Sequence, residues 1–244
     1  MYLIRECSYN TENPVYMRIS NEKKSMFIPE ARVAKDYFNT GFYERCYIDW
    51  LLNNEIVKSD KNIIDIGAHI GWYTVSLADK CKHIYSFECS PKSFNYLCAN
   101  IALNSIDYKV TKYNSALSGS VGTTKYYIRD KQDGGGNGIS KFEYDNMQNV
   151  PSIDVPMNTL DSYELKDINF IKIDVEGHEL EVLKGSVKTI KNNNYPKILF
   201  ESWDNEREGY PIKKLKQELF EFIISLGYKI IKLGVDTYLA YVEK

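Results

Sequence analysis

The sequence lacks the usual features of a membrane-spanning, secreted or nucleic-acid-binding protein. No apolar run approaches the length of a membrane span, and residues 1–6 do not follow a secretory-leader pattern. Basic residues are not in excess, because 31 Lys and Arg stand against 33 Asp and Glu. The five cysteines are odd in number and form no C-x-x-C pair. We therefore expect reduced thiols in a cytoplasmic protein, with no membrane and no nucleic-acid partner.

The remaining composition is that of a globular α/β protein. With 43% hydrophobic and 26% charged residues, the 244-residue chain can form one large core. From residue 59 onward, short β-branched runs alternate with segments of helical periodicity, which predicts a mostly parallel, doubly wound sheet. The runs 229–233 and 237–241 predict a terminal hairpin that adds one antiparallel strand. We expect residues 1–58 to form a small N-terminal β/α extension packed on a core domain of residues 59–244.

The most informative segment is residues 65–71, Asp-Ile-Gly-Ala-His-Ile-Gly, which follows a β-branched run. A strand, a glycine turn and a helix beginning at Trp72 form the usual cradle for a nucleotide-like cofactor, and Gly67 permits a sharp turn with close ligand approach. The dinucleotide fingerprint would need glycine where His69 and Trp72 stand, so the spacing disfavours a nicotinamide cofactor. The acid at the strand end, Asp65, instead suits a cationic ligand without phosphate, such as S-adenosylmethionine.

Acidic residues stand at the ends of four predicted strands. Glu88 follows the apolar run 83–87 and lies about 20 residues after Gly67, where an acid can bind both hydroxyls of a ribose. Ser90 then predicts a helix N-cap, with proline in the first turn. Ligands of such sheets bind at the carboxyl ends of the strands. We therefore expect one crevice to contain all four acids: Asp65, Glu88, Asp174 and Glu201.

Three segments, in order, resemble the FkbM family of S-adenosylmethionine-dependent methyltransferases: residues 65–74, 87–91 and 171–179. Two connecting stretches, 116–118 and 158–161, also look like those of the family, so that the resemblance covers roughly residues 42–205. It implies an α/β class I methyltransferase (Rossmann-like) fold, whose doubly wound sheet has seven mostly parallel strands with the terminal strand reversed. It also implies methylation of an oxygen, on a natural product or a sugar.

The resemblance implies the residues that contact the cofactor. They come from the motifs and from the stretch before 116–118: Asp65, Gly67, Ala68, His69, Gly71, Trp72, Thr74, Glu88, Ser90, Ser115, Ala116 and Asp174. The chain departs from the family at His69, where asparagine is usual, and at His178, where a small residue is frequent.

Three residues are candidates for catalysis. Methyl transfer needs an aligned acceptor oxygen and removal of its proton. Asp174 could orient the hydroxyl, act as base, bind a metal or cap the next helix, and Glu176 could cap that helix or take part in the chemistry. His178 is a candidate general base because imidazole titrates near neutral pH, whereas a solvent-facing place at the helix start is the alternative.

The acceptor and metal sites are less determined. Glu201 and Trp203 could bind a sugar by carboxylate hydrogen bonds and ring stacking, or pack at the sheet edge. Asp174, Glu176, His178 and Glu201 would suit a divalent metal, but their spacing matches no strict motif, so the metal stays unassigned. The glycine-rich segment 133–138 lacks the Lys-Ser/Thr of a P-loop and is expected to shape the acceptor site.

The sequence therefore predicts an S-adenosylmethionine-dependent O-methyltransferase. The expected acceptor is a small hydroxylated molecule, a sugar or nucleotide sugar of glycan biosynthesis. An RNA ribose O-methyltransferase is one alternative, which the lack of a Lys/Arg cluster disfavours. A non-catalytic cofactor-binding protein is another, which the acids Asp65, Glu88 and Asp174 disfavour. Tyrosine-rich N-terminal strands leave a homodimer open.

Overall fold

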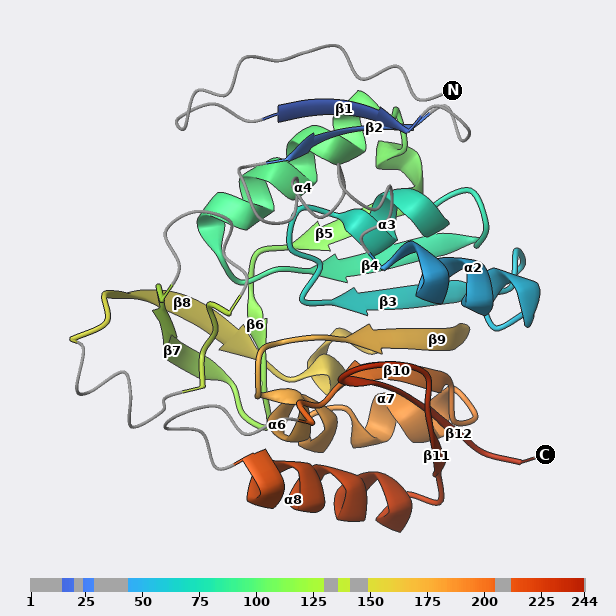
Figure 1. Ribbon diagram of the computed structural model, residues 1–244, viewed down its shortest axis with the longest axis vertical. Helices are drawn as coiled ribbons and strands as arrows, with labels where there is room; N and C mark the ends of the chain where they lie inside the picture. Colours follow the sequence, from blue (N-terminus) through green and yellow to red (C-terminus); the bar gives the residue numbers. More distant parts are fainter. Residues whose placement is uncertain are drawn as a thin grey trace.

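The computed structural model describes residues 15–19, 24–28, 44–129, 136–140, 149–204 and 212–243. Its centre is a seven-stranded sheet of order β11-β12-β10-β9-β3-β4-β5 (Figure 1). The parallel strands are β3 (Asn62–Ile66), β4 (His83–Phe87), β5 (Val110–Tyr113), β9 (Ile168–Ile173) and β10 (Lys197–Glu201). Strand β12 (Thr237–Tyr241) runs antiparallel between β10 and β11 (Lys229–Lys232). The predicted α/β fold, with its reversed terminal strand, is confirmed.

Helices cover both faces of this sheet. One face packs against α2 (Arg45–Asn53), α3 (Trp72–Leu77) and α4 (Pro91–Leu103), and the other against α6 (Glu179–Lys184), α7 (Val187–Asn192) and α8 (Ile212–Ser225). Successive strand residues point to opposite faces, so that Ile63 joins the first cluster and Ile64 the second. The central strands are therefore buried on both sides, as parallel sheets require.

A second, three-stranded sheet stands beyond the carboxyl ends of the parallel strands, where Figure 1 shows β7 and β8. It consists of β6 (Ala116–Leu117), β8 (Ser152–Asn158) and β7 (Gly122–Tyr127), in that order. The sequence alone predicts strands from the runs 122–128 and 153–157, which β7 and β8 confirm, but it does not indicate that these strands leave the main sheet. The three-stranded sheet therefore flanks the loops that follow the parallel strands of the main sheet.

The helical spacing of Leu180, Leu183, Val187 and Ile190 predicts one helix after β9, but the structure has two short helices there, α6 and α7. The break falls at Gly185, where a Cβ would lie 2.0 Å from the backbone oxygen of Ser118. The chain at Gly185 is pressed against a neighbouring loop, and the helix ends there. The apolar periodicity continues across the break because both short helices pack on the same face of the sheet.

The N-terminal hairpin of β1 (Val15–Ile19) and β2 (Lys24–Ile28) packs on α4 through β2. Asn100 accepts a hydrogen bond from Phe27 N (2.6 Å) and donates to Phe27 O (3.0 Å), and Asn104 pairs in the same way with Ser25 (2.8 and 2.6 Å). Two asparagines one helical turn apart thus bind the edge of a strand. The apolar run 2–4 also predicts a strand, but it lies outside the described residues, and the domain division at residue 58 stays a prediction.

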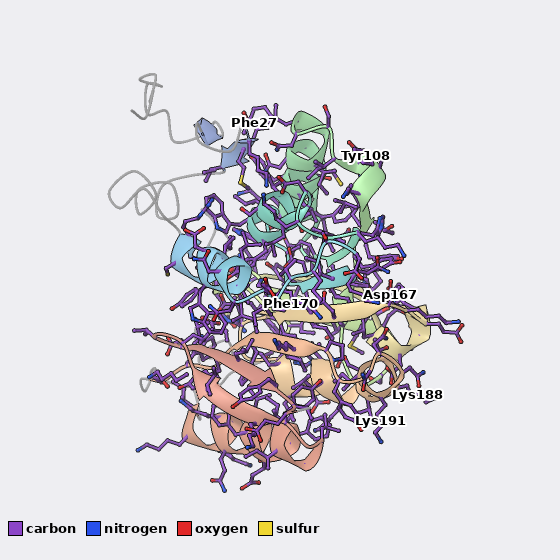
Figure 2. All side chains as sticks on the ribbon, turned by 90° about the vertical axis from the view of Figure 1, so that its right-hand side faces the viewer. Phe27, Tyr108, Asp167, Phe170, Lys188 and Lys191 are labelled. Carbon is purple, nitrogen blue, oxygen red and sulfur yellow. The ribbon has the colours of Figure 1, made fainter. Side chains whose placement is uncertain are left out.

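The opposite end of the sheet, where the parallel strands begin, faces the viewer in Figure 2. Asp167 precedes β9 there and pairs with Lys61 at 2.6 Å, while Phe170 lies inside the sheet. None of the described helices is both long and apolar enough to cross a lipid bilayer.

Candidate functional site

A cavity of about 360 Å³ opens at the carboxyl ends of β3, β4 and β9. Its volume lies within the range of small-molecule sites, roughly 300–1,000 Å³. Nine of the residues predicted from the sequence line it: Gly67, Ala68, His69, Trp72, Glu88, Ala116, Asp174, Glu176 and Glu201. The predicted crevice at the strand ends is therefore present, and it contains three of the four expected acids.

The turn after β3 forms the floor of the cavity. Gly67 has a φ of +72°, and the backbone amides of Gly67 and Ala68 both donate to the Phe87 oxygen, at 3.0 and 2.9 Å. A Cβ at Gly67 would lie 1.7 Å from the backbone oxygen of Asp174. Glycine is therefore required here for two reasons, the left-handed backbone and the close approach of the loop that follows β9.

Glu88 is held at one end of the cavity by backbone amides. Its Oε2 accepts a hydrogen bond from His69 N at 2.8 Å, and its Oε1 accepts one from Ser90 N at 2.7 Å. Burial raises the pKa of this carboxyl, and the two amide bonds oppose that rise. Each carboxylate oxygen retains further acceptor capacity, so the group can still bind hydroxyls of a ligand.

Asp65 lies beneath the cavity rather than in its wall. It is 2% exposed, and its Oδ2 accepts a hydrogen bond from Thr74 Oγ1 at 2.6 Å. The Lys172 ammonium lies 3.8 Å from Asp65 Oδ1 and 3.3 Å from Asp174 Oδ2, and it donates to Gly67 O at 2.8 Å. The predicted acid at the strand tip therefore pairs with a lysine under the turn.

Lys172 is a site residue that sequence reasoning missed. It lines the cavity, is 6% exposed, and lies 5.4 Å from the centre of the Tyr73 ring. Burial lowers the pKa of its ammonium, but Asp174 and Asp65 outweigh that effect and hold the pKa above its usual value. The available signal was a charged residue inside an otherwise apolar strand.

Three carboxylates meet at the end of the cavity near β10. Asp174, Glu176 and Glu201 each offer an oxygen atom, all within 4.8 Å of one another. Burial, then Asp174 and Glu176, raise the pKa of Glu201 well above its usual value, while Trp203 Nε1 donates to Glu201 Oε2 at 3.1 Å. Oxygen ligands of this kind suit a hard divalent cation, and His178 is not part of the group.

Glu44 is a second site residue absent from the sequence prediction. It precedes α2, with a left-handed φ of 51°, and its side chain lines the cavity instead of capping the helix. Burial, then Asp174, raise the pKa of Glu44 to about 7, although Lys172 and a hydrogen bond from Tyr73 act in the opposite direction. No pattern around residue 44 distinguishes it from an ordinary acid before a helix.

His178 does not line the cavity. Its Nε2 lies 3.0 Å from Ser118 Oγ and its Nδ1 lies 3.2 Å from Ser140 Oγ, and burial lowers the pKa of the ring to about 4. Gly136 N also donates to Glu176 Oε1 at 3.1 Å. The segment 136–140 is thus held against the turn after β9.

The remainder of the glycine-rich segment is only partly described. Residues 136–139 line the cavity, and residues 133–135 lie outside the described part of the chain, so that a role in shaping the acceptor site stays a prediction. Neither Asp174 nor Glu176 is the N-cap of α6, because that position is His178. In the loop before this helix, Glu179 accepts from the amides of Val175 (3.1 Å) and Gly177 (3.2 Å). Burial raises the pKa of Glu179 to about 7.

The other residues predicted to contact the cofactor or the acceptor lie outside the cavity lining and bind neighbouring parts of the chain instead. Gly71 begins α3 against Leu97, and Ser90 caps α4 by accepting from Ser93 N at 3.3 Å. Ser115 Oγ donates to Pro156 O at 3.2 Å, and Trp203 packs in a small apolar cluster with Ile212. None of these residues lines the cavity, nor does Thr74, which binds Asp65.

A comparison with known families decides the affiliation. A family profile described as the methyltransferase FkbM domain matches residues 65–230, about two thirds of the chain. The chain belongs to the FkbM methyltransferase family. All three motifs that carried the resemblance fall within the matched region, including the Gly67 turn and the loop after β9.

This FkbM-family chain is similar to several named methyltransferases, at low sequence identity. It is 28% identical over 141 residues to the hexuronic acid methyltransferase AglP of Haloferax volcanii, covering 58% of this chain and 56% of that one. It is 25% identical over 182 residues to methyltransferase 1 of Beauveria bassiana, covering 64% and 69%. The crystal structure of a methyltransferase FkbM from Methylobacillus flagellatus has a TM-score of 0.56 and 18% identity, covering 87% and 48%. This chain spans about half the length of the first and third of these proteins.

Proposed function

We propose that this chain is an S-adenosylmethionine-dependent O-methyltransferase that acts on a hydroxyl of a small acceptor of the sugar class. The observation that carries the proposal is the cavity in which the Gly67 turn, Glu88 and Asp174 meet. The family supports methyl transfer, and the hexuronic acid methyltransferase among its relatives supports a sugar acceptor.

The residues present fit S-adenosylmethionine by their chemistry. A side chain at Gly67 would collide with the Asp174 backbone. Glycine therefore lets the turn after β3 and the loop after β9 pack together beneath the cavity. Glu88 offers two oriented carboxylate oxygens, the partner that a ribose diol requires. The acidic lining beyond the turn suits a ligand with a sulfonium and an ammonium group, and it would repel the pyrophosphate of a dinucleotide.

The chain's own residues have separate tasks in this proposal. When bound, S-adenosylmethionine supplies an electrophilic methyl carbon to an acceptor oxygen. Asp174 orients the acceptor hydroxyl and takes up its proton, and Glu176 lies beside it in the same wall. Glu201, held by Trp203, faces the acceptor side. His178 acts by positioning the segment 136–140 through Ser140.

The first experiment is calorimetric titration of the protein with S-adenosylmethionine and S-adenosylhomocysteine, each with Mg²⁺ and with EDTA. Micromolar binding of both ligands supports the proposal, and a difference between the two conditions would indicate a bound cation, for which Asp174, Glu176 and Glu201 are the candidate ligands. Absence of binding in both conditions would refute it.

A variant then separates catalysis from cofactor binding. Asp174→Asn should lose turnover and keep most of the affinity for S-adenosylmethionine, because the amide keeps the shape of the side chain and cannot accept the proton. Candidate acceptors are a neutral hexose, a hexuronic acid and a nucleotide sugar. Equal turnover of Asp174→Asn and wild type on the preferred acceptor would remove Asp174 from the chemistry.

A further inference from the structure

The cavity has two chemically different ends. At the end near β4, Glu88 is fixed by backbone amides and suits a diol. At the other end, over β3 and β9, the side chains of Glu44, Tyr73, Lys172 and Asp174 line the wall. A cofactor whose ribose lies at Glu88 must therefore extend its amino-acid part over the Gly67 turn, towards this second group.

Glu44 is held in the second group at a conformational cost. Its φ of 51° is a conformation that non-glycine residues rarely adopt. The start of α2 is satisfied by the backbone, since Glu44 O accepts from Tyr47 N (3.0 Å) and Ile48 N (3.3 Å). The side chain is therefore not needed as a helix cap and is turned into the cavity.

The charges around Glu44 do not balance within the cavity wall. Its carboxyl receives a hydrogen bond from the Tyr73 hydroxyl and lies near the carboxylates of Asp174 and Asp65. The Lys172 ammonium is already bonded to Gly67 O and lies 3.3 Å from Asp174. A positive group of a ligand would supply the missing charge.

We infer that Glu44 binds the α-ammonium group of S-adenosylmethionine, at the end of the cavity opposite Glu88. The inference rests on the proposed function, because it takes the cavity to be the site of that cofactor. It adds a residue outside the sequence motifs and assigns it to one chemical group of the ligand. The sulfur and the ribose are bound without it.

The test compares two ligands that carry the α-ammonium group with one that lacks it. S-adenosylmethionine and S-adenosylhomocysteine carry the ammonium group, and 5′-methylthioadenosine lacks the amino-acid part. Charged hydrogen bonds contribute about 1.5–3 kcal/mol, which corresponds to roughly 10- to 150-fold in affinity. We expect calorimetry to show such a loss for the first two ligands in Glu44→Gln, and 5′-methylthioadenosine to bind within about twofold of wild type.

Two further variants control for structure. Glu55→Gln is matched in chemistry and in backbone, because Glu55 follows the same helix with a φ of 50° and is exposed outside the cavity. It should bind all three ligands as wild type does. Glu44→Gly relieves the backbone strain and removes the carboxylate, so it should unfold at a temperature no lower than wild type while showing the same selective loss of affinity.

The outcomes distinguish the inference from its alternatives. Equal weakening of all three ligands would make Glu44 a structural residue. Unchanged binding of all three, with reduced turnover, would place Glu44 on the acceptor. Either result overturns the inference and leaves the proposed function standing. Failure of the wild-type protein to bind any of the three would overturn the proposed function and the inference together.

Discussion

The backbone oxygen of Asp174 lies where the Cβ of any side chain at Gly67 would have to be, at a separation of 1.7 Å. The turn after β3 and the loop after β9 can therefore pack this closely only because residue 67 has no side chain. This contact joins the residue that shapes the cofactor floor to the residue proposed to act on the acceptor, so a change at one displaces the other.

Gly67→Ala tests this contact. Gly227 is a matched control, because it also has a positive φ (92°) but no atom within 4 Å of the position that a Cβ would take. Gly227→Ala should cost about 1 kcal/mol in the free energy of unfolding, from the backbone alone. Gly67→Ala should cost about 2 kcal/mol more, from overpacking, and should abolish cofactor binding. If urea unfolding showed the same loss of stability for Gly67→Ala and Gly227→Ala, the close contact between residue 67 and Asp174 O would be contradicted.

Lys172→Met should be strongly destabilising, because it leaves the buried carboxylate of Asp65 and the half-buried carboxylate of Asp174 without a cation. Removing one partner of a buried ion pair costs about 3–5 kcal/mol. Asp65→Asn in the same background should recover part of this loss, because the amide carries no charge. Urea unfolding of Lys172→Met, Asp65→Asn and the double variant gives the coupling free energy between the two side chains. Additive effects would show that Lys172 acts through packing alone.

His178 should make stability depend on pH. Burial lowers its pKa from 6.5 to about 4, so the folded state favours the neutral ring. Its contribution is fully present above pH 6.5 and is lost as the pH falls towards 4. Between pH 7.5 and pH 5, wild type should lose about 1–2 kcal/mol more than His178→Gln, because one pKa unit corresponds to about 1.4 kcal/mol. Parallel pH profiles of the two proteins would contradict this.

Glu201→Gln should stabilise the protein without ligand. The pKa of Glu201 is raised by burial and by neighbouring carboxylates, so the folded state resists its ionisation. That penalty is absent below about pH 4.5 and grows as the pH rises. The amide oxygen can still accept from Trp203 Nε1, and the variant should melt higher than wild type at pH 8 but not at pH 4.5. A lower melting temperature at pH 8 would show that the charge is compensated.

Much of the main sheet was predictable, because buried parallel strands appear as short β-branched runs and their carboxyl ends are recognisable by the acids that follow. Glu88 and Asp174 were found in this way. The three-stranded sheet was not recognised as separate, since β6 has only two residues and β7 is largely exposed. Local patterns identify strands, but not the sheet to which each strand belongs.

The site was predicted less completely than the fold, for a physical reason. Motifs report the turn residues, whereas charge compensation depends on which side chains meet in space. Asp65 was expected to face a cationic ligand, and in the structure Lys172 already lies beside it. Glu44 enters the cavity from a segment with no motif, and His178 is enclosed by serines from two distant loops. None of these partners is determined by spacing along the chain.

The amides of Asn100 and Asn104 contact β2 through its backbone alone. These four bonds hold the strand by its backbone, and the buried side chains of Met26 and Ile28 add apolar contacts in the same core cluster as α4. Asn100 also donates to Ile70 O at 2.8 Å, inside the segment that follows the Gly67 turn. Asn100 therefore ties the hairpin and the segment after the Gly67 turn to the same side chain, so that its loss would loosen both at once.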